Sequence, residues 1–219
     1  MASKIFKYYH DQLWLFTNES SPNEVIRLFD EWAEQYDQIM QEPEYNVPRP
    51  FVRHFDATVC NLFPDVDKKS FKVLDVAAGT GLLGLELNKL GYTYIDALDM
   101  SQEMLNRAKN KKVYTKLICT AVNDQQINGI ETAEYDALTC SSAVCAGQVQ
   151  PSAFSEMLMM VKSGGLLCFN ISFLEERNYI QKFKELEEAG RWRLLNKEKI
   201  PFLLEKQLEE CYLYIYKHK

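Results

Sequence analysis

Two acidic side chains flank a glycine-rich segment in the first half of the sequence. Asp75 comes just before the segment Ala77-Ala-Gly79-Thr-Gly81, and Asp99 follows twenty-four residues after Asp75. Glycine lets a backbone approach a ligand closely, and the free N–H groups of a helix that follows such a turn face the same point. A carboxylate at the end of the neighbouring strand can accept both hydroxyl groups of a ribose. These residues therefore predict a nucleoside site.

The same glycines leave a second class of ligand open. Gly79, Gly81 and Gly84 match the G-x-G-x-x-G fingerprint of dinucleotide sites, a pattern that is weak evidence alone. A carboxylate at Asp75 would repel a pyrophosphate, whereas it would attract an ammonium or sulfonium group. The sequence contains no Tyr-x-x-x-Lys pair of the kind that short-chain dehydrogenases use, and its length leaves no room for a separate substrate domain. An NAD-dependent reductase is therefore the less favoured alternative.

Alternating strands and helices must position these residues. Apolar segments typical of strands alternate with segments of helical period from residue 72 onward. The pattern predicts an α/β fold, a doubly wound and mostly parallel seven-stranded sheet with helices on both faces, and a ligand at the carboxyl ends of the strands. The last two strands are expected to form a closing hairpin with an antiparallel edge strand. The expected strands are 72–76, 94–98, 116–120, 135–139, 166–171, 191–195 and 211–216, and the helices between them are 82–89, 102–109, 151–161 and 175–189.

The first 64 residues have a different pattern, which predicts a helical N-terminal cap packed on an α/β domain of residues 65–219. Ser21-Pro22 is a typical helix start, and apolar residues follow it at helical spacing. Phe29 and Trp32 are interpreted as core residues of that helix. A second helix is expected over 51–62, after a proline-rich loop. The first twenty residues are expected to form a lid that orders over a bound ligand, because such a ligand must be shielded from water.

The composition limits the class of protein. The chain has 219 residues, 47% hydrophobic and 26% charged, as in an ordinary globular protein. Its net charge of −6 argues against a nucleic-acid partner, and no apolar segment is long enough to span a membrane. Without a secretory signal, and with six cysteines that lack C-x-x-C spacing, a cytoplasmic location with reduced thiols is expected. None of the three histidines stands at metal-ligand spacing, so no metal site is expected.

Residues 71–172 resemble a class I S-adenosylmethionine-dependent methyltransferase, a family with a Rossmann-like fold. An N-terminal phrase, Phe29-Asp-x-Trp-Ala-x-x-Tyr-Asp37 with Tyr45 and Pro48, resembles more narrowly the methyltransferase-like protein 27 group. The segments that carry the broader resemblance are Val73-Leu-Asp-Val-Ala-Ala-Gly-Thr-Gly81, Leu98-Asp-Met-Ser-x-x-Met-Leu-x-x-Ala108, Tyr135-Asp-Ala137 and Val161-Lys-Ser-Gly-Gly-Leu-Leu167.

The resemblance implies a role for ten residues in binding S-adenosylmethionine, whose product is S-adenosylhomocysteine. One of them departs from the family pattern: Ala77 stands where many members have the first glycine, and the turn survives this change if φ is negative there. The implied contacts are Asp75, Ala77, Gly79 and Gly81 around the methionine part, Tyr36 over its carboxylate, Asp99 on the ribose, Met100, Ala121 and Val122 on the adenine, and Cys140 near the sulfonium.

The methyl acceptor is harder to predict. Residues 139–144 lack the prolines of the motif that DNA-adenine and glutamine methyltransferases carry after the fourth strand, and the chain is acidic. A small-molecule acceptor in a monomer or homodimer is therefore the favoured hypothesis. A protein methyltransferase, or a cofactor-binding protein that acts through a partner without turnover, remain alternatives. No catalytic residue is identified, and the candidate acceptor contacts are Tyr9, His10, Trp14, Tyr45 and Ser141.

Overall fold

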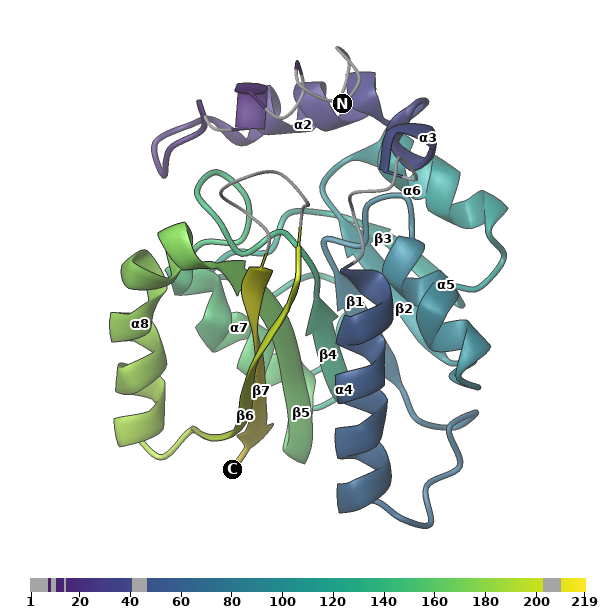
Figure 1. Ribbon diagram of the computed structural model, residues 1–219, viewed down its shortest axis with the longest axis vertical. Coiled ribbons are helices and arrows are strands. Elements are labelled where there is room, and N and C mark those ends of the chain that lie inside the picture. Colours follow the sequence, from purple (N-terminus) through teal and green to yellow (C-terminus); the bar gives the residue numbers. More distant parts are fainter. Residues whose placement is uncertain (1–7, 9–10, 14, 41–46, 203–209) are drawn as a thin grey trace.

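A seven-stranded sheet forms the centre of the protein (Figure 1). The computed structural model describes residues 8, 11–13, 15–40, 47–202 and 210–219. The order of the strands in the sheet is β3-β2-β1-β4-β5-β7-β6, with β1 in the middle of the parallel part. The strands are β1 (Val73–Val76), β2 (Ile95–Asp99), β3 (Lys116–Cys119), β4 (Tyr135–Cys140), β5 (Val161–Ser172), β6 (Trp192–Pro201) and β7 (Glu210–His218).

Helices cover both faces of the sheet, and two N-terminal helices lie above the carboxyl ends of the strands (Figure 1). α4 and α5 pack on one face and α7 and α8 on the other. The expected doubly wound α/β fold is thereby confirmed. The helices are α2 (Pro22–Trp32), α3 (Tyr36–Met40), α4 (Pro48–Leu62), α5 (Leu82–Lys89), α6 (Gln102–Asn110), α7 (Phe154–Met160) and α8 (Phe173–Glu188), with a short turn of 3-10 helix η1 (Pro151–Ala153) before α7.

The C-terminal hairpin closes the sheet, as expected, and its edge strand β6 pairs antiparallel with β7. β7 lies inside the sheet between β5 and β6 and is antiparallel to both. The burial of the two strands explains the order. Most residues of β7 are buried, whereas Lys197, Glu198 and Lys199 of β6 form an exposed charged run. Charged side chains are suited to an edge strand, which has one unpaired side and must not associate with other strands.

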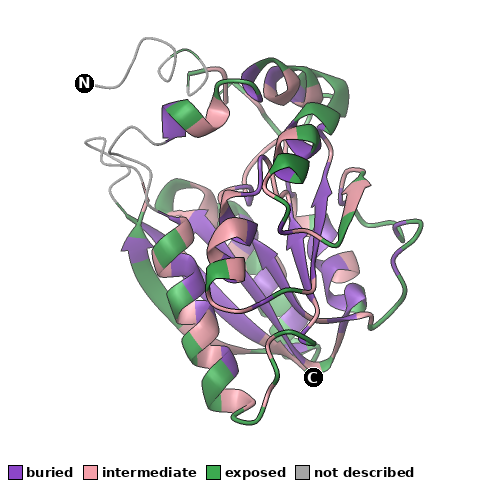
Figure 2. Cartoon of the chain, turned by 90° about the vertical axis from the view of Figure 1, so that its right-hand side faces the viewer, coloured by how far each residue is buried: buried purple, intermediate pink, exposed green. Residues whose placement is uncertain are grey.

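Each face of the sheet buries its own apolar cluster, as alternating side chains require. The alternation predicted for Tyr212, Tyr214 and Tyr216 is confirmed. Tyr214 and Tyr216 stack on each other with ring centroids 5.8 Å apart, and Tyr216 stacks on Trp192 at 3.9 Å, beneath α8. Figure 2 shows the result: buried strands between helices whose outer sides are exposed.

Helix α4 packs directly against the sheet. Phe51, Phe55 and Val59 have no exposed surface and lie in one cluster with Val73 of β1 and Leu87 of α5. The expected division at residue 64, into an N-terminal cap packed on the core and an α/β domain, stays a prediction. α2 and α3 are the described helices that remain above the sheet. The expected lid of residues 1–20 stays a prediction, because much of it lies outside the described residues.

Two carboxylates tie the N-terminal helices to the α/β unit. Asp30 of α2 accepts hydrogen bonds from the Ser101 hydroxyl (2.5 Å) and the Glu103 N–H (3.3 Å) at the start of α6. Asp37 of α3 accepts a hydrogen bond from the Thr80 hydroxyl in the glycine turn, and it forms an ion pair with Lys111 at the end of α6. These bonds place α2 and α3 over the glycine turn and over both ends of α6.

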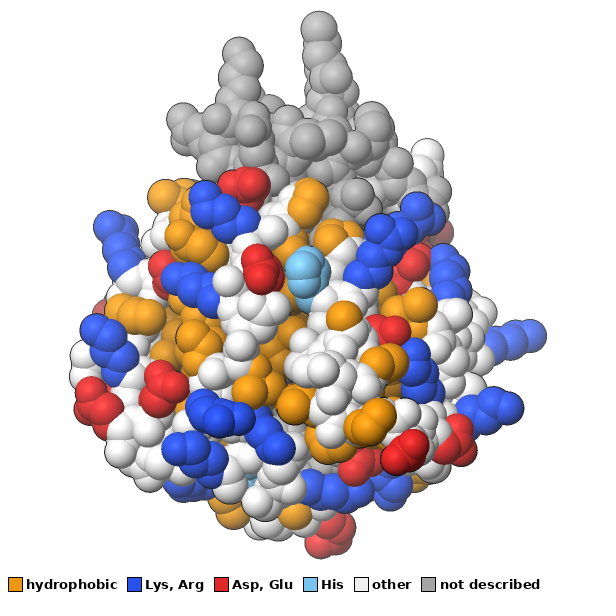
Figure 3. All heavy atoms as spheres, turned by 60° about the horizontal axis from the view of Figure 1, so that its bottom comes forward, with side chains coloured by type: hydrophobic (Ala, Val, Ile, Leu, Met, Phe, Trp, Pro, Cys, Tyr) orange, Lys and Arg blue, Asp and Glu red, His pale blue; other side chains and the backbone are white. Residues whose placement is uncertain are grey.

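The outer surface carries both signs of charge. Figure 3 shows the lower face of Figure 1, away from the N-terminal helices, where basic and acidic side chains are interspersed. Within the described part of the chain, no helix combines the length and the apolar character that crossing a membrane requires. All six cysteines are free thiols.

The third glycine of the fingerprint has a packing role. A Cβ at Gly84 would overlap the ring of Tyr114, which lies against this first turn of α5. A Cβ at Gly81, where φ is +87°, would lie 2.7 Å from the same ring. The Tyr114 hydroxyl then donates a hydrogen bond of 2.7 Å to Asp75. The two glycines therefore make room for the tyrosine that contacts Asp75.

We expect Gly84→Ala to lower the free energy of unfolding by about 1–3 kcal/mol, because the added methyl group overpacks the Tyr114 ring. In a Tyr114→Leu background the same change should no longer destabilise the protein and should stabilise it by up to about 1 kcal/mol, since alanine is the better helix former. Urea unfolding of the four proteins of this double-mutant cycle measures the coupling. An equal loss in both backgrounds would show that Tyr114 is not the cause.

Candidate functional site

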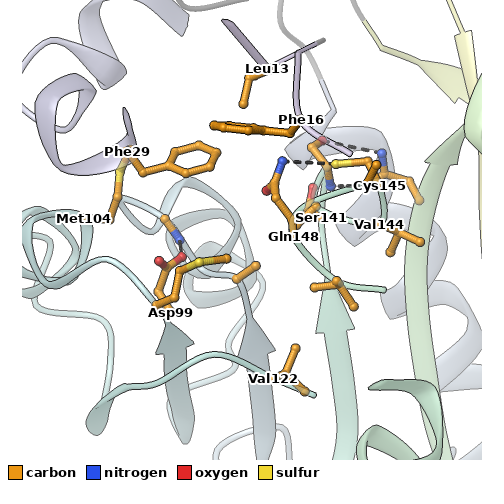
Figure 4. Close-up of a pocket in the computed structure, with 18 of the residues that line it drawn as sticks. Leu13, Phe16, Phe29, Asp99, Met104, Val122, Ser141, Val144, Cys145 and Gln148 are labelled. Carbon is orange, nitrogen blue, oxygen red and sulfur yellow. Dashed lines mark hydrogen bonds between the residues drawn. The ribbon is translucent and has the colours of Figure 1, made fainter. Parts of the chain in front are cut away.

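A cavity of 230 Å³ opens at the carboxyl ends of the parallel strands (Figure 4). Its wall includes Asp99 at the end of β2, Ser141 after β4 and Ser172 at the end of β5. A smaller hollow of 40 Å³ adjoins it and is lined by Asp75 and the glycine turn. Both are lined by Tyr36, Ala77, Gly79 and Ser141. The two hollows therefore lie next to each other above β1, as expected for the site of a doubly wound sheet.

The backbone of the glycine turn adopts the left-handed conformation, with positive φ, at a residue other than glycine. Ala77 has φ +54°, so the turn is present here without the negative φ on which its survival was expected to depend. Gly79 and Gly81 also have positive φ, at +55° and +87°. The left-handed conformation costs a residue with a Cβ roughly 1–2 kcal/mol. The surroundings hold it in place: the N–H of Ala78 donates to the Leu98 carbonyl at 3.1 Å.

Asp99 is held by backbone N–H groups on both sides. Its oxygens accept hydrogen bonds from Gly79 N–H (2.7 Å) and from Ser101 N–H (2.8 Å), and it is only 8% exposed. Burial raises the pKa of this carboxyl to about 6, against the opposing effect of the two N–H groups. Asp99 is therefore largely ionised at pH 7, and each oxygen keeps a lone pair for a hydroxyl group of a ligand.

Asp75 lies beneath the glycine turn and is 1% exposed. It accepts hydrogen bonds from the Tyr114 hydroxyl (2.7 Å) and the Thr139 hydroxyl (3.0 Å). Burial raises the pKa of Asp75 to about 7, although both hydroxyl groups favour the ionised form. A cation bound in the adjoining hollow would stabilise the carboxylate and lower this pKa.

Aromatic residues of the N-terminal segment form the roof of the cavity. Trp32 and Tyr36 meet with ring centroids 4.6 Å apart, and Phe29 stacks beside Trp32. Phe29 and Trp32 do pack with apolar neighbours, as the helical spacing predicts, yet both also line the cavity. Phe16 lies at the top of Figure 4, and its Cβ approaches Gly147 so closely that a Cβ there would be 2.9 Å away. The segment before α2 thus contacts the loop after β4.

The loop after β4 forms the wall opposite Asp99 (Figure 4). Ser142 has φ +60°, and its N–H donates to the side-chain oxygen of Asn170 at 2.9 Å. Gln148 donates from its side-chain nitrogen to the sulfur of Cys145 at 3.0 Å. The hydroxyl oxygen of Ser141 is buried and has no hydrogen-bond partner among the described residues. No sequence motif marks this loop, so of its residues only Ser141 was predicted for the site.

The structure brings most of the predicted cofactor residues together. It does not bring Gly81, which caps α5, or Cys140, which is fully buried in the core of the sheet, to the wall of either hollow. Tyr9, His10, Trp14 and Tyr45 lie outside the described residues. The predicted residues that line the main cavity are Tyr36, Ala77, Gly79, Asp99, Met100, Ala121, Val122 and Ser141, and Asp75 lines the smaller hollow.

Sequence comparison identifies the family. Residues 73–165 match a family described as a methyltransferase domain. Human methyltransferase-like protein 27 is 30% identical over 172 residues, which cover 76% of this chain and 67% of that protein. The chain belongs to the class I S-adenosylmethionine-dependent methyltransferases. The cofactor of this methyltransferase is S-adenosylmethionine, and the NAD alternative is set aside.

A second sequence relative and a solved structure are also similar to this chain. Malonyl-[acyl-carrier protein] O-methyltransferase 2 of Ilyobacter polytropus is 26% identical over 206 residues, which cover 86% of this chain and 74% of that protein. The structure of magnesium protoporphyrin IX methyltransferase from Synechocystis PCC 6803 shares the fold, with a TM-score of 0.63 and 13% identity over 91% of this chain and 98% of that one.

The raised pKa of Asp75 predicts that its contribution to stability depends on pH. The unfolded chain releases this proton near pH 4 and the folded chain near pH 7, so the folded state binds more protons between these values. The stabilisation is fully present below the lower value and is lost as the pH rises through the higher one. We expect the wild type to lose stability relative to Asp75→Asn between pH 5 and pH 8, measured by urea unfolding of the cofactor-free protein. A difference that stays constant with pH would contradict the raised pKa.

Proposed function

We propose that this methyltransferase transfers a methyl group from S-adenosylmethionine to a small-molecule acceptor held in the same cavity. The observation that carries the proposal is the continuity of the site. One cavity extends from Asp99, at the end of β2, to Ser172 and Glu175, at the start of α8, beneath aromatic residues of the N-terminal segment. A donor and an acceptor bound at its two ends would lie side by side and shielded from water.

The Asp99 end fits the adenosine half of the cofactor. Asp99 has spare acceptor capacity for the two ribose hydroxyl groups, because its existing partners are single N–H groups on each oxygen. Apolar side chains of Met100, Met104, Val122 and Phe29 line the cavity around it. They suit the faces of an adenine ring.

The smaller hollow fits the methionine half. Asp75 provides a buried carboxyl for the ammonium group of the amino acid, and Tyr36 lines the hollow opposite the glycine turn. Ser141, whose buried hydroxyl has no partner among the described residues, lines both hollows. A buried hydroxyl without a hydrogen bond is costly, so a polar ligand group beside it is expected. This observation supports a ligand that spans both hollows.

Bound S-adenosylmethionine supplies an activated methyl group on a sulfonium. The chain therefore needs only to orient the two reactants and to exclude water, which accounts for much of the rate enhancement of such a reaction. Asp99 and Asp75 fix the donor, and the loop after β4 faces the acceptor. Phe16, Phe29 and Tyr36 of the roof line this cavity and reduce the access of water to the space between the two reactants.

The wall near α8 supports a small acceptor. It is built from apolar residues with a few polar groups between them, which is typical of small-molecule sites. A roofed cavity of this kind suits a small molecule better than an extended peptide. Its apolar residues are Phe16, Val144, Val149, Ile171 and Phe202. The monomer or homodimer and the cytoplasmic location stay predictions from the sequence.

Asp99→Asn should weaken binding of S-adenosylmethionine by about ten- to a hundredfold, since a lost hydrogen bond to a charged group costs about 1.5–3 kcal/mol. An asparagine also places a donor against one of the two N–H groups that Asp99 now accepts. Calorimetric titration measures the change. Asp96→Asn is the matched control, because Asp96 is also buried in β2 but lines neither hollow. The affinity of this variant for S-adenosylmethionine should equal that of the wild type.

Parallel titrations with S-adenosylmethionine, S-adenosylhomocysteine and NAD test the cofactor itself. Micromolar binding of the first two and no binding of NAD is expected. Methyl transfer is then followed as formation of S-adenosylhomocysteine with candidate acceptors. Binding of NAD, or of none of the three, would contradict the proposed site.

A further inference from the structure

Among the described residues of the cavity wall there are acidic groups and no basic ones. Its described residues include two carboxylates, Asp99 at one end and Glu175 at the other, and they include no lysine, arginine or histidine. Asp99 is assigned to the cofactor ribose under the proposed function. Glu175 therefore remains as the charged group of the acceptor end.

Among the described residues, Glu175 is a carboxylate without a counter-ion. Within the described chain no ion pair involves it, and its side chain accepts one hydrogen bond, from the side-chain amide of Asn178 at 3.2 Å. Its neighbour Glu176 differs: Glu176 pairs with Lys197 at 2.7 Å and also accepts from the Tyr214 hydroxyl. Glu175 lines the cavity and Glu176 does not. The charge that faces the cavity is thus the one left uncompensated.

Glu175 also lies close to the loop after β4. Burial and then the negative charge of Glu175 raise the pKa of the Cys145 thiol to about 12. Cys145 lines the same cavity, beside Val144 in Figure 4. Glu175 therefore acts on the wall where an acceptor would lie.

The hydrogen-bonding groups at this end point to a ligand that donates. The side-chain nitrogen of Gln148 donates one of its two N–H groups to Cys145 at 3.0 Å, and that of Asn170 donates to the Cys211 sulfur at 3.4 Å and to the Ser142 hydroxyl at 3.5 Å. The Asn170 oxygen is used by the Ser142 N–H. The carboxylate of Glu175 keeps unused acceptor capacity. An ammonium group supplies three donors and the missing positive charge.

We propose that the acceptor is a small organic cation, an amine carried on an apolar body, whose charged group pairs with Glu175. The apolar body would lie along Val144, Val149 and Ile171, under Phe16. This inference rests on the proposed function, because it concerns the acceptor end of the same site. Glu175 recognises the charged amine of the acceptor, whichever atom of the acceptor is methylated.

The start of α8 does not reverse this preference. A helix N-terminus carries roughly half a positive charge, which favours anions. Here the first turn already contains Glu175 and Glu176, and the Ser172 hydroxyl accepts the Glu175 N–H at 3.2 Å. A full negative charge on Glu175 outweighs the half charge of the helix end. A carboxylate ligand would meet this repulsion with no basic side chain among the described wall residues to offset it.

Two probes of the same size and opposite charge test the proposal. Phenethylamine and hydrocinnamate share a phenyl ring on a two-carbon chain and end in an ammonium and a carboxylate. Each is titrated by calorimetry into the full chain saturated with S-adenosylhomocysteine, so the test does not depend on turnover. We expect phenethylamine to bind at least about tenfold more tightly, as a hydrogen-bonded charge pair allows. Equal or tighter binding of hydrocinnamate, or binding of neither probe, would overturn the proposal.

Glu175→Gln tests the residue with almost no change in shape. It should abolish the preference for phenethylamine while leaving the affinity for S-adenosylhomocysteine unchanged. Glu188→Gln, an exposed residue at the other end of α8, makes the same change in net charge and should keep the preference. A preference that survives in Glu175→Gln would overturn the proposal. Failure of the wild type to bind S-adenosylhomocysteine would instead overturn the proposed function, and the acceptor assignment with it.

Discussion

The carboxylate of Asp99 is the point on which the site depends. One of its oxygens accepts the Gly79 N–H of the glycine turn, and the other accepts the Ser101 N–H at the start of α6. A single buried side chain therefore fixes the end of β2 relative to the turn after β1 and the helix after β2. Because the carboxylate is already oriented by backbone groups, its remaining lone pairs have a defined direction. Such preorganisation lowers the entropic cost of ligand binding.

The N-terminal helices are attached at the same place. Ser101 gives its N–H to Asp99 and its hydroxyl to Asp30 of α2, so one residue joins the roof and the floor of the cavity. Asp37 repeats this arrangement at the glycine turn through Thr80. The position of the roof thus follows from hydrogen bonds to the elements that hold the cofactor end. A change in the conformation of the glycine turn would therefore also shift the residues of the roof.

The glycine fingerprint has a physical cause here that differs from its usual interpretation. In dinucleotide sites the third glycine allows close packing of helix on strand. In this methyltransferase Gly84 makes room for the Tyr114 ring, whose hydroxyl contacts the buried carboxyl of Asp75. The same pattern of glycines therefore occurs in a site where the carboxyl group of Asp75 lies beside the glycine turn, at the place that a pyrophosphate occupies in dinucleotide sites. The residues around a motif decide its function, and here Asp75 and Tyr114 do so.

The sequence by itself determined the order of strands and helices, the class of fold and the pairing of Asp99 with the glycine turn. These features follow from local periodicity and from the rule that the carboxyl ends of neighbouring parallel strands meet at one edge. Only the tertiary structure placed β7 inside the sheet, gave Ala77 a positive φ, turned Cys140 into the core and brought Glu175 to the cavity. Each of these outcomes depends on contacts between residues far apart in the chain. Local patterns do not encode such contacts, because several arrangements of the strands and helices are compatible with the same periodicity. The chain adopts the arrangement in which its apolar groups are best buried and its polar groups are best hydrogen-bonded.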